Sequence, residues 1–374
     1  MTALTRLRLT DFRSHATLDL PLDARPVCLF GANGAGKTNV LEAISQLGPG
    51  RGLRAAALPD MTRQGASGGW TISATLDEDR KLGVGLESSG NGHKRIIRLD
   101  GAPATATDLA DLIRIVWLTP AMDSVFRGGA SERRRFFDRQ VMAHIPSHGS
   151  VSNRYEKAMR ERNALLERGR VDPAWADAIE GRMAEAGAMI ASNRARILVA
   201  LQEAIDTRPE GYFPKGDLAL DGDAEQAAGE GAGLFDIQDL IAEALAKGRY
   251  RDQAAGRTLS GPHRTDLSVI HRPTGAAAGD ASTGQQKALL IGLILASARA
   301  LNADGDGPSP LILLDEAAAH LDRDRRAALF DELIELGGQA WLTGTEEFLF
   351  EAFGDRAQRV EITGTDEGSP LLQS

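Results

Sequence analysis

Apolar and polar residues alternate along the first twenty residues, a pattern typical of half-buried β-strands. It predicts two short strands joined by a turn around residues 11–16, with apolar positions at Leu4, Leu7, Leu9, Leu18 and Leu20. Residues 27–30 form an unbroken apolar run directly before Gly31, which predicts a third strand. A helix should follow over residues 37–47, because Gly-Pro-Gly comes next and stops it.

A β-meander is predicted after that helix, because three runs of strand-forming residues are separated by tight-turn signals. The runs cover residues 70–76, 81–87 and 95–99. Asn91-Gly92 and Asp100-Gly101 supply the positive φ angles that tight hairpin turns need. A further strand at 116–118 should end before Pro120.

From Ser131 the pattern becomes helical. Asp172 is a good N-cap, and a proline is tolerated at the first helical position that follows it. Apolar residues then recur at three- and four-residue steps, at Ile179, Met183, Ala186, Ile190, Ile197, Leu201 and Ile205. This predicts one long amphipathic helix, paired with a helix over 151–166. The acidic, glycine-rich residues 221–233 predict a loop, and the next helix should end at Gly248.

The chain returns to α/β character after Tyr250. A helix from Ser282, a strand at 311–314, a helix from Asp322 and a strand near 340–343 are expected. The predicted fold class is therefore α/β with an inserted α-helical lobe. Residues 1–125 and 255–374 would form the split α/β lobe, which includes the antiparallel β subdomain, and residues 126–254 the insert. A length of 374 residues agrees with two domains.

Composition narrows the functional classes. No apolar run approaches the ~20 residues that cross a bilayer, and the N-terminus lacks a signal-peptide pattern, so we expect a cytoplasmic protein without a membrane partner. The single cysteine, Cys28, cannot form an internal disulfide. The net charge of −9 argues against a generally basic nucleic-acid coat, yet residues 127–170 hold eleven basic and five acidic side chains, a local +6.

Residues 31–38 match the phosphate-loop pattern of Gly, four residues, Gly, Lys, and Ser or Thr. They are Gly31, Ala32, Asn33, Gly34, Ala35, Gly36, Lys37 and Thr38. Glycines let backbone N–H groups approach phosphates, and the following helix adds the positive end of its dipole. Lys37 would reach the β- and γ-phosphates of ATP, and Thr38 would ligate Mg²⁺. The structural alternative is a glycine-rich turn with an incidental lysine.

Two acids directly follow the predicted strand at 311–314. Its unbroken apolar run indicates a strand buried on both faces, and open α/β sheets bind ligands at the carboxyl ends of their strands. Asp315 would hold Mg²⁺ through water, and Glu316 would orient or deprotonate the attacking water. Taken alone, a core strand running into a polar turn explains the pattern equally well.

A capped helix start before this strand is typical of ABC-type ATPases. Ser282, Gly284 and Gln285 would form an anion site that closes over the γ-phosphate held by a second subunit. The motif is imperfect, because Ala281 replaces the usual leucine. Asp322 lies in a segment that matches the D-loop of this class and would reach the dimer interface, although it could also simply cap the next helix.

ABC transporters usually carry a γ-phosphate-sensing histidine after the last strand of this sheet. Here residues 343–345 are Thr-Gly-Thr. A threonine or a water would have to substitute for the histidine, so slow ATP hydrolysis is expected.

Together these motifs resemble the RecF recombination-mediator family, over almost the whole chain. The shared blocks are residues 11–14, 31–38, 118–123, 132–139, 260–264, 282–287 and 311–322. The resemblance implies an ABC-type ATPase lobe related to SMC heads, with ATP and Mg²⁺ as cofactors. It also implies an ATP-dependent homodimer that binds double-stranded DNA near single-strand gaps, works with RecO and RecR in loading RecA, and takes part in replication, repair and the SOS response.

An arginine-rich segment follows the predicted strand at 116–118. Its arginines could contact DNA phosphates, and they are Arg127, Arg133, Arg134, Arg135 and Arg139. A solvated helix face, or pairing with Glu132 and Asp138, explains them equally well. Arg13 could reach a nucleotide phosphate from the first hairpin. Residues 260–264 indicate a Gly-Pro turn without a derivable mechanism.

Three other classes of protein share part of this pattern. An ABC transporter's nucleotide-binding subunit would be more compact between its phosphate loop and its signature. An SMC-like chromosome clamp would show apolar heptads sustained over many turns. A small-molecule kinase would leave the motifs at 282–287 and 319–322 unexplained.

Overall fold

The computed structural model describes residues 2–89, 92–167, 172–305, 307–364 and 372–373, and the chain divides into two compact units. Unit 1 comprises Met1–Asp123, Pro209–Phe213 and Leu290–Ser374, and unit 2 comprises Ser124–Arg208 and Pro214–Leu289. The first division falls close to the predicted end of the α/β lobe at residue 125. The second differs from the predicted boundary at 254/255, because β10 (Asp266–His271) pairs with β9 (Gly216–Asp221) inside unit 2.

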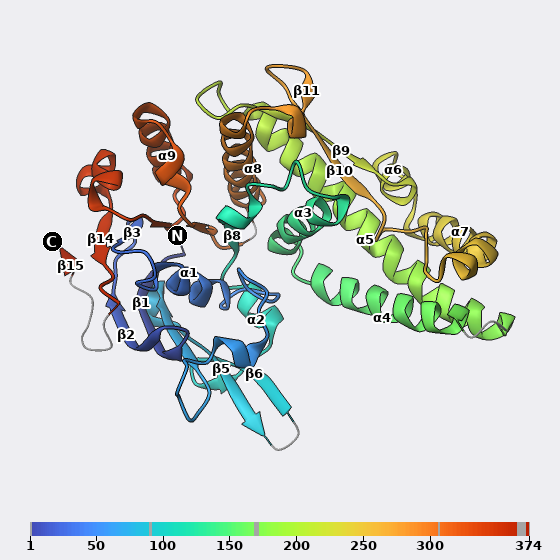
Figure 1. The fold of residues 1–374 in the computed structure, drawn as a ribbon, viewed down its shortest axis with the longest axis horizontal. Coiled ribbons are helices and arrows are strands. Elements are labelled where there is room, and N and C mark those ends of the chain that lie inside the picture. Colours follow the sequence, from blue (N-terminus) through green and yellow to red (C-terminus); the bar gives the residue numbers. More distant parts are fainter. Residues whose placement is uncertain (1, 90–91, 168–171, 306, 365–371, 374) are drawn as a thin grey trace. The chain divides into compact units, whose positions relative to one another are not determined.

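Unit 1 contains a largely parallel sheet with the strand order β15-β14-β3-β13-β12-β8 (Figure 1). The strands are β3 (Val27–Phe30), β8 (Ile115–Leu118), β12 (Leu311–Leu314), β13 (Ala340–Thr343), β14 (Gln358–Glu361) and the antiparallel edge strand β15 (Leu372–Gln373). Every residue of β3, β8, β12 and β13 is buried, which explains their apolar runs, and Thr343 at the end of β13 is the one polar residue among them. Because β3, β13 and β12 are parallel, their carboxyl ends meet at one edge.

A second sheet of unit 1 is antiparallel, in the order β2-β1-β4-β5-β6-β7. Its strands are β1 (Leu4–Phe12), β2 (His15–Pro21), β4 (Thr71–Leu76), β5 (Lys81–Ser89), β6 (Gly92–Leu99) and β7 (Ala102–Pro103). The predicted first hairpin and the meander are thereby confirmed. Asp100 and Gly101 have the expected positive φ, at 51° and 85°. Asn91 lies outside the described residues.

The helices α1 (Lys37–Ser45) and α9 (Arg323–Leu336) of unit 1 begin where the sequence predicted. The short α2 (Ala106–Ala110) was not predicted. The helix α8 (Thr283–Ala303) starts in unit 2 and continues in unit 1. Short 3₁₀ segments include Ala317–His320 and Glu347–Arg356. Within the described ranges, no helix is both long and apolar enough to cross a membrane.

Unit 2 is mainly helical. Its helices are α3 (Ala130–His144), α4 (His148–Glu167), α5 (Pro173–Thr207), α6 (Asp223–Gly229) and α7 (Leu234–Ala255). The predicted long helix is α5, and Asp172 caps it by accepting a hydrogen bond from the Ala174 N–H. Apolar side chains of α4, α5 and α7, among them Tyr155, Met183 and Leu245, form the core.

Two predictions in this unit were wrong. The expected loop at 221–233 contains the end of β9 and all of α6. The helix expected to end at Gly248 continues to Ala255 and is capped by Gly256 at φ 65°. Gly248 is buried inside this helix, and a Cβ there would meet Asp252 Oδ2 at 3.4 Å, an ordinary contact distance, so the glycine does not end the helix.

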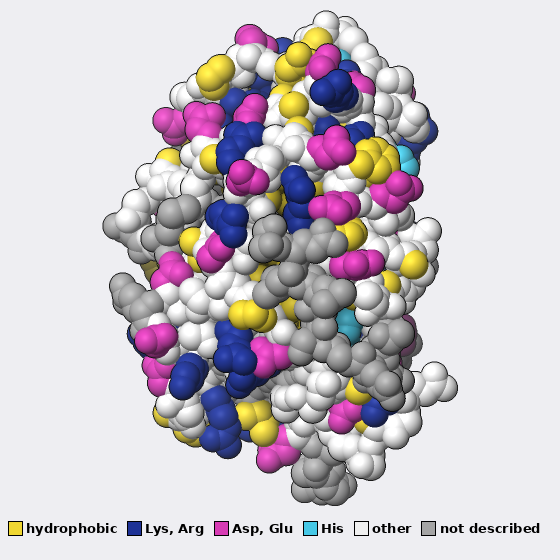
Figure 2. Space-filling view, turned by 90° about the vertical axis from the view of Figure 1, so that its left-hand side faces the viewer, with side chains coloured by type: hydrophobic (Ala, Val, Ile, Leu, Met, Phe, Trp, Pro, Cys, Tyr) yellow, Lys and Arg dark blue, Asp and Glu magenta, His cyan; other side chains and the backbone are white. Residues whose placement is uncertain are grey.

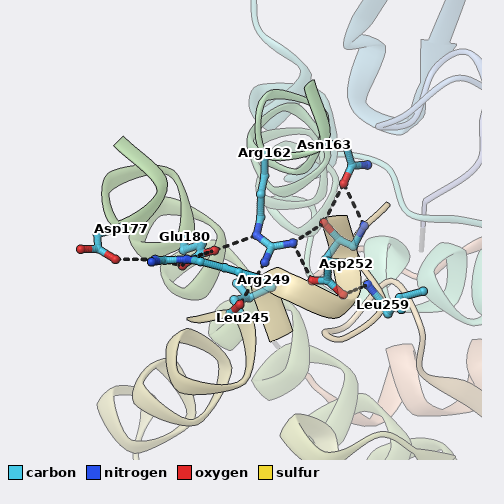
Figure 3. A network of polar contacts seen from close by, with 9 residues as sticks. Arg162, Asn163, Asp177, Glu180, Leu245, Arg249, Asp252 and Leu259 are labelled. Atoms are coloured by element: carbon cyan, nitrogen blue, oxygen red, sulfur yellow. Dashed lines mark hydrogen bonds and ion pairs between the residues drawn. The ribbon is translucent and has the colours of Figure 1, made fainter. Parts of the chain in front are cut away.

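A buried polar network joins α4, α5 and α7 (Figure 3). Arg162 donates through Nε to Glu180 at 2.9 Å and through Nη1 to Asp252 at 2.7 Å. It also donates to Thr258 Oγ1 and to the Leu245 carbonyl, both at 2.9 Å. The side chains of Arg162 and Asp252 have no solvent exposure. Each charge is thus compensated by a partner of opposite sign or by a hydrogen bond.

The segment 260–264, which the sequence left unexplained, packs against unit 2 through the buried Pro262 and the half-buried His263, while Arg264 is exposed. The His263 ring nitrogens contact the Tyr155 hydroxyl at 2.8 Å and the Thr258 carbonyl at 3.1 Å. Arg194 donates to the Pro262 carbonyl at 2.7 Å while pairing with Asp138 and Glu225. A Cβ at the second residue of the segment, a glycine at φ 120°, would lie 2.5 Å from the Tyr155 hydroxyl. The turn is therefore a packing element.

Candidate functional site

The phosphate loop runs from the carboxyl end of β3 into α1. Gly31, Gly34 and Gly36 have φ angles of 140°, 82° and 104°, which only glycine adopts freely. A Cβ at Gly31 would lie 2.3 Å from the Ile362 carbonyl oxygen. The N-cap of α1 is Gly36, which offers no side-chain cap, so the first turn presents its N–H groups to a ligand.

Lys37 lies within the curve of this loop. Its ammonium donates to the carbonyls of Gly31 at 2.7 Å and Ala32 at 2.8 Å. Burial lowers the pKa of Lys37, while the nearby charges of Glu316 and Asp315 oppose that shift. The lysine therefore lies in the field of both the predicted Mg²⁺ ligand Asp315 and the predicted base Glu316.

The carboxyl end of β12 brings those acids to the loop. Thr38 Oγ1 donates to Asp315 Oδ1 at 2.9 Å, which joins two motifs that lie far apart in the sequence. Asp315 is buried, and Glu316 follows it with φ 53° and ψ 17°, a left-handed backbone that non-glycine residues rarely adopt. Thr343 on β13 contacts both acids: its hydroxyl donates to Asp315 Oδ1 and accepts from the Glu316 N–H.

The donor set formed by Thr38 and Asp315 fits Mg²⁺. Both atoms are hard oxygen donors, and Mg²⁺ keeps most of its waters while binding one or two carboxylates and substrate phosphates. A large all-protein cage is therefore unnecessary for this metal.

The turn between β1 and β2 covers the phosphate loop, a contact that the sequence did not reveal. His15 Nε2 lies 3.2 Å from the Gly36 carbonyl, and since a carbonyl only accepts, this nitrogen carries the ring proton. Burial lowers the pKa of His15. A Cβ at Gly36 would lie 2.6 Å from both His15 Nε2 and Ser14 Oγ. Ser14 also accepts a hydrogen bond from Asn39 of α1 at 2.8 Å.

Arg13, which the sequence suggested as a contact to a nucleotide phosphate, is engaged elsewhere. Its guanidinium pairs with both oxygens of the fully buried Glu42 at 2.6 and 2.9 Å, and donates to the Asp60 carbonyl. Arg54 pairs with the same carboxylate at 2.7 Å. Arg13 thus ties the β1–β2 turn to α1 and holds the phosphate loop indirectly.

The predicted signature begins α8. Ser282 and Gln285 form a reciprocal cap, with the Ser282 N–H donating to Gln285 Oε1 at 2.9 Å and the Gln285 N–H to Ser282 Oγ at 3.3 Å. Ser282 and Gly284 are exposed, and a Cβ at Gly284 would meet nothing within 4 Å. Gln286 is buried and donates to the carbonyls of Gly279 and Ala281. The exposed start of α8 is therefore held in place by the buried Gln286 and is accessible to a ligand or partner.

Asp322 caps α9, since its Oδ1 accepts from the Arg325 N–H at 2.9 Å. The carboxylate remains 61% exposed. The capping role is confirmed, and it leaves the side chain accessible to a second subunit.

The five candidate DNA-binding arginines differ in their surroundings. Arg133 donates to both oxygens of Asp266, and Arg134 donates to the Thr265 carbonyl at 2.7 Å. Arg127 reaches the Ala281 carbonyl at 3.4 Å. Burial, helped by the charge of Arg135, lowers the pKa of Arg139 to about 10. Of the five, Arg127 and Arg135 are exposed, while Arg133 and Arg134 are half-buried and held by contacts within unit 2.

Surface charge is mixed on one face of the molecule. Figure 2 shows one face of the molecule, on which Lys and Arg side chains are interspersed with Asp and Glu. This arrangement agrees with the net charge of −9 and gives that face no single sign.

The parallel sheet, the phosphate loop and the acidic strand define an ABC-type ATPase head. The family model described as RecF/RecN/SMC N terminal domain matches residues 3–363. Among solved structures, the fold is similar to that of a recombination mediator protein RecF in the RecFOR pathway, at a TM-score of 0.83 and 20% identity, covering 100% of this chain and 98% of that one. An Smc head domain from Pyrococcus furiosus gives a TM-score of 0.55 at 16% identity, covering 100% of this chain and 97% of that one.

Relatives found by sequence comparison are more similar in sequence to this chain than these solved structures are. The DNA replication and repair protein RecF of Brucella suis biovar 1 (strain 1330) is 52% identical over 366 residues, covering 96% of this chain and 94% of the relative. The protein of the same name from Rhizobium etli (strain CIAT 652) is 50% identical over 361 residues, covering 95% and 96%. The chain belongs to the RecF family of DNA replication and repair proteins.

Proposed function

We propose that this protein is a slow ABC-type ATPase that dimerises around ATP on DNA and acts in recombinational repair and replication restart. The observation that carries the proposal is the convergence of Lys37, Thr38, Asp315 and Glu316 at the carboxyl edge of one sheet. The relatives named DNA replication and repair protein RecF supply the biological setting.

Each chain would hold one ATP on its phosphate loop. The N–H groups of residues 31–38 and the dipole of α1 would bind the phosphates, and Lys37 would exchange its carbonyl contacts for phosphate oxygens. Bound Mg²⁺, held by Thr38 and by Asp315 through water, would neutralise phosphate charge. Glu316 would orient the attacking water or accept its proton.

The second half of each site would come from the other chain. Ser282 and Gly284 are exposed and Gln285 is half-buried at the start of α8, whose N–H groups and dipole favour an anion. They would contact the γ-phosphate held by the partner, and the exposed Asp322 would lie at the same interface. Two chains would thus enclose two nucleotides head to tail.

The DNA partner would be duplex, including duplex beside a single-strand gap, and RecR and RecO would be protein partners that help load RecA. The structure of the RecF protein in the RecFOR pathway supports that setting. Of the candidate arginines, Arg127 and Arg135 are exposed, whereas Arg133 would have to leave Asp266 to reach a phosphate. DNA binding through phosphates should be insensitive to sequence and should weaken steeply with salt.

Glu316→Gln tests the proposal. This substitution should slow ATP hydrolysis by about 10²–10⁴-fold, the usual contribution of a general base, and should prolong the ATP-bound dimer. Turnover would be followed by phosphate release, and dimerisation by light scattering with and without a gapped duplex. Lys37→Ala is the matched control, because it should abolish nucleotide binding and dimerisation together. An unchanged turnover rate for Glu316→Gln would refute the assignment of the base.

A further inference from the structure

Thr343 ends β13, which lies between β3 and β12 in the parallel sheet. Its neighbours are therefore the strand that leads into the phosphate loop and the strand that ends in the two acids. The residue is 1% exposed, so its hydroxyl needs partners from the protein.

Both hydrogen-bonding functions of that hydroxyl are used on consecutive residues. Thr343 Oγ1 donates its single proton to Asp315 Oδ1 at 2.8 Å. The same oxygen accepts from the Glu316 N–H at 2.8 Å. Thr38 Oγ1 reaches the same Asp315 oxygen at 2.9 Å, which completes a chain of contacts from the phosphate loop to Glu316.

The backbone of Glu316 explains why this support matters. Its φ of 53° lies in the left-handed region, and a non-glycine residue stays there only where its surroundings hold it. The Glu316 N–H bond to Thr343 is one such restraint, so it fixes the direction in which the glutamate leaves the strand. Asp315 is held at the same time, because the hydroxyl bonds to its carboxylate.

We propose that Thr343 is a positioning residue for ATP hydrolysis, which aligns Asp315 and Glu316 through one hydroxyl. The inference rests on the roles proposed for those two acids. It assigns a task to the threonine at the end of the strand where ABC transporters place a switch histidine. The hydroxyl acts through its hydrogen bonds to the Asp315 carboxylate and the Glu316 N–H.

The hydroxyl can be removed without changing the shape of the side chain, by Thr343→Val. We expect the rate constant for hydrolysis to fall about 10–100-fold, as for other groups that orient catalytic ligands. The affinity for a fluorescent ATP analogue should stay within about twofold, since the groups that bind phosphate in the loop remain in place. Thr343→Ser keeps the hydroxyl and should recover most of the rate. Thr343→Ala serves as a second hydroxyl-free variant if valine does not fold.

Three outcomes are decisive. A wild-type rate in the hydroxyl-free variant overturns the proposal, as does a rate in Thr343→Ser as low as that without a hydroxyl. Loss of nucleotide affinity in proportion to the lost rate also overturns it, because that indicates a general structural role. Glu316→Gln, measured in parallel, separates the two hypotheses. If Glu316→Gln is slow while Thr343→Val is normal, only the inference about Thr343 fails. If Glu316→Gln is also normal, the proposed base fails, and the inference fails with it.

Discussion

Replacing Arg162 with methionine should destabilise unit 2 by about 3–5 kcal/mol, the usual cost of removing one partner from a buried ion pair. Methionine fills much of the same volume but supplies none of the four hydrogen bonds that Arg162 donates (Figure 3). Glu180 would keep Arg249 as a cationic partner. Asp252 would keep the Leu259 N–H at 3.1 Å, but the carboxylate has no solvent exposure, so most of the loss should arise there.

Hydrogen exchange read by mass spectrometry would locate this loss, because it reports the opening free energy of separate segments. Peptides from α4 and α7 should lose protection in Arg162→Met, and urea unfolding should shift to lower concentration. Arg160→Met is the matched control on the same helix. Arg160 is 68% exposed and pairs with Glu156 at 3.7 Å, so its loss should cost under about 1 kcal/mol.

A double variant provides a second check. Arg162→Met combined with Asp252→Asn removes the unpaired charge, so it should recover part of the lost free energy of unfolding. Equal stability of Arg162→Met and Arg160→Met would refute the reasoning. So would a double variant less stable than Arg162→Met alone, because it would show that the buried carboxylate is not the source of the loss.

Two further predictions concern the cover over the phosphate loop. Gly36→Ala should lower the melting temperature more than Gly34→Ala. Both glycines have positive φ, but only a Cβ at Gly36 would meet Ser14 and His15. Equal losses of melting temperature would show that Ser14 and His15 can move aside without cost. Since burial lowers the pKa of His15, the unfolded chain binds more protons than the folded one below about pH 6.5, so stability should fall as the pH drops through that range. His15→Gln should show a smaller drop in melting temperature between pH 7.5 and pH 5.5, and an identical drop would contradict the assignment.

Local signals in the sequence predicted much of the fold. Strands at 27–30 and 311–314 are unbroken apolar runs, the strand at 340–343 is apolar up to Thr343, and the structure places β3, β12 and β13 at those residues. Strands with weaker patterns were missed. β14 has only two buried residues and is defined by its pairing with β3, while β9 pairs with a strand that follows after two intervening helices. Such pairings depend on distant partners, which no local window contains.

The candidate site likewise has a part that the sequence predicted and a part that it did not. The phosphate loop and the acidic pair follow from residue types at short spacing, and the structure joins them through Thr38 and Asp315. The supporting residues could not be predicted, because His15 contacts Gly36 through a turn and Thr343 contacts Asp315 across neighbouring strands. For the arginines of α3, the sequence suggested more than the structure supports. Their charge suggested a DNA-binding surface, but whether a guanidinium is free to bind DNA depends on protein partners such as Asp266, which pairs with Arg133.

The place of β3 in its sheet sets the order in which a newly made chain can assemble. β3 ends at Phe30, yet both of its sheet neighbours, β13 and β14, lie beyond residue 339. At roughly 5–20 residues per second, a ribosome needs on the order of 15–60 s to supply them after β3 has been made. Until then the phosphate loop has its sequence but lacks the strands that support it. A nascent chain that stops early would carry the complete loop motif without a working nucleotide site, so ATP can stabilise only chains whose synthesis has passed the last of these strands.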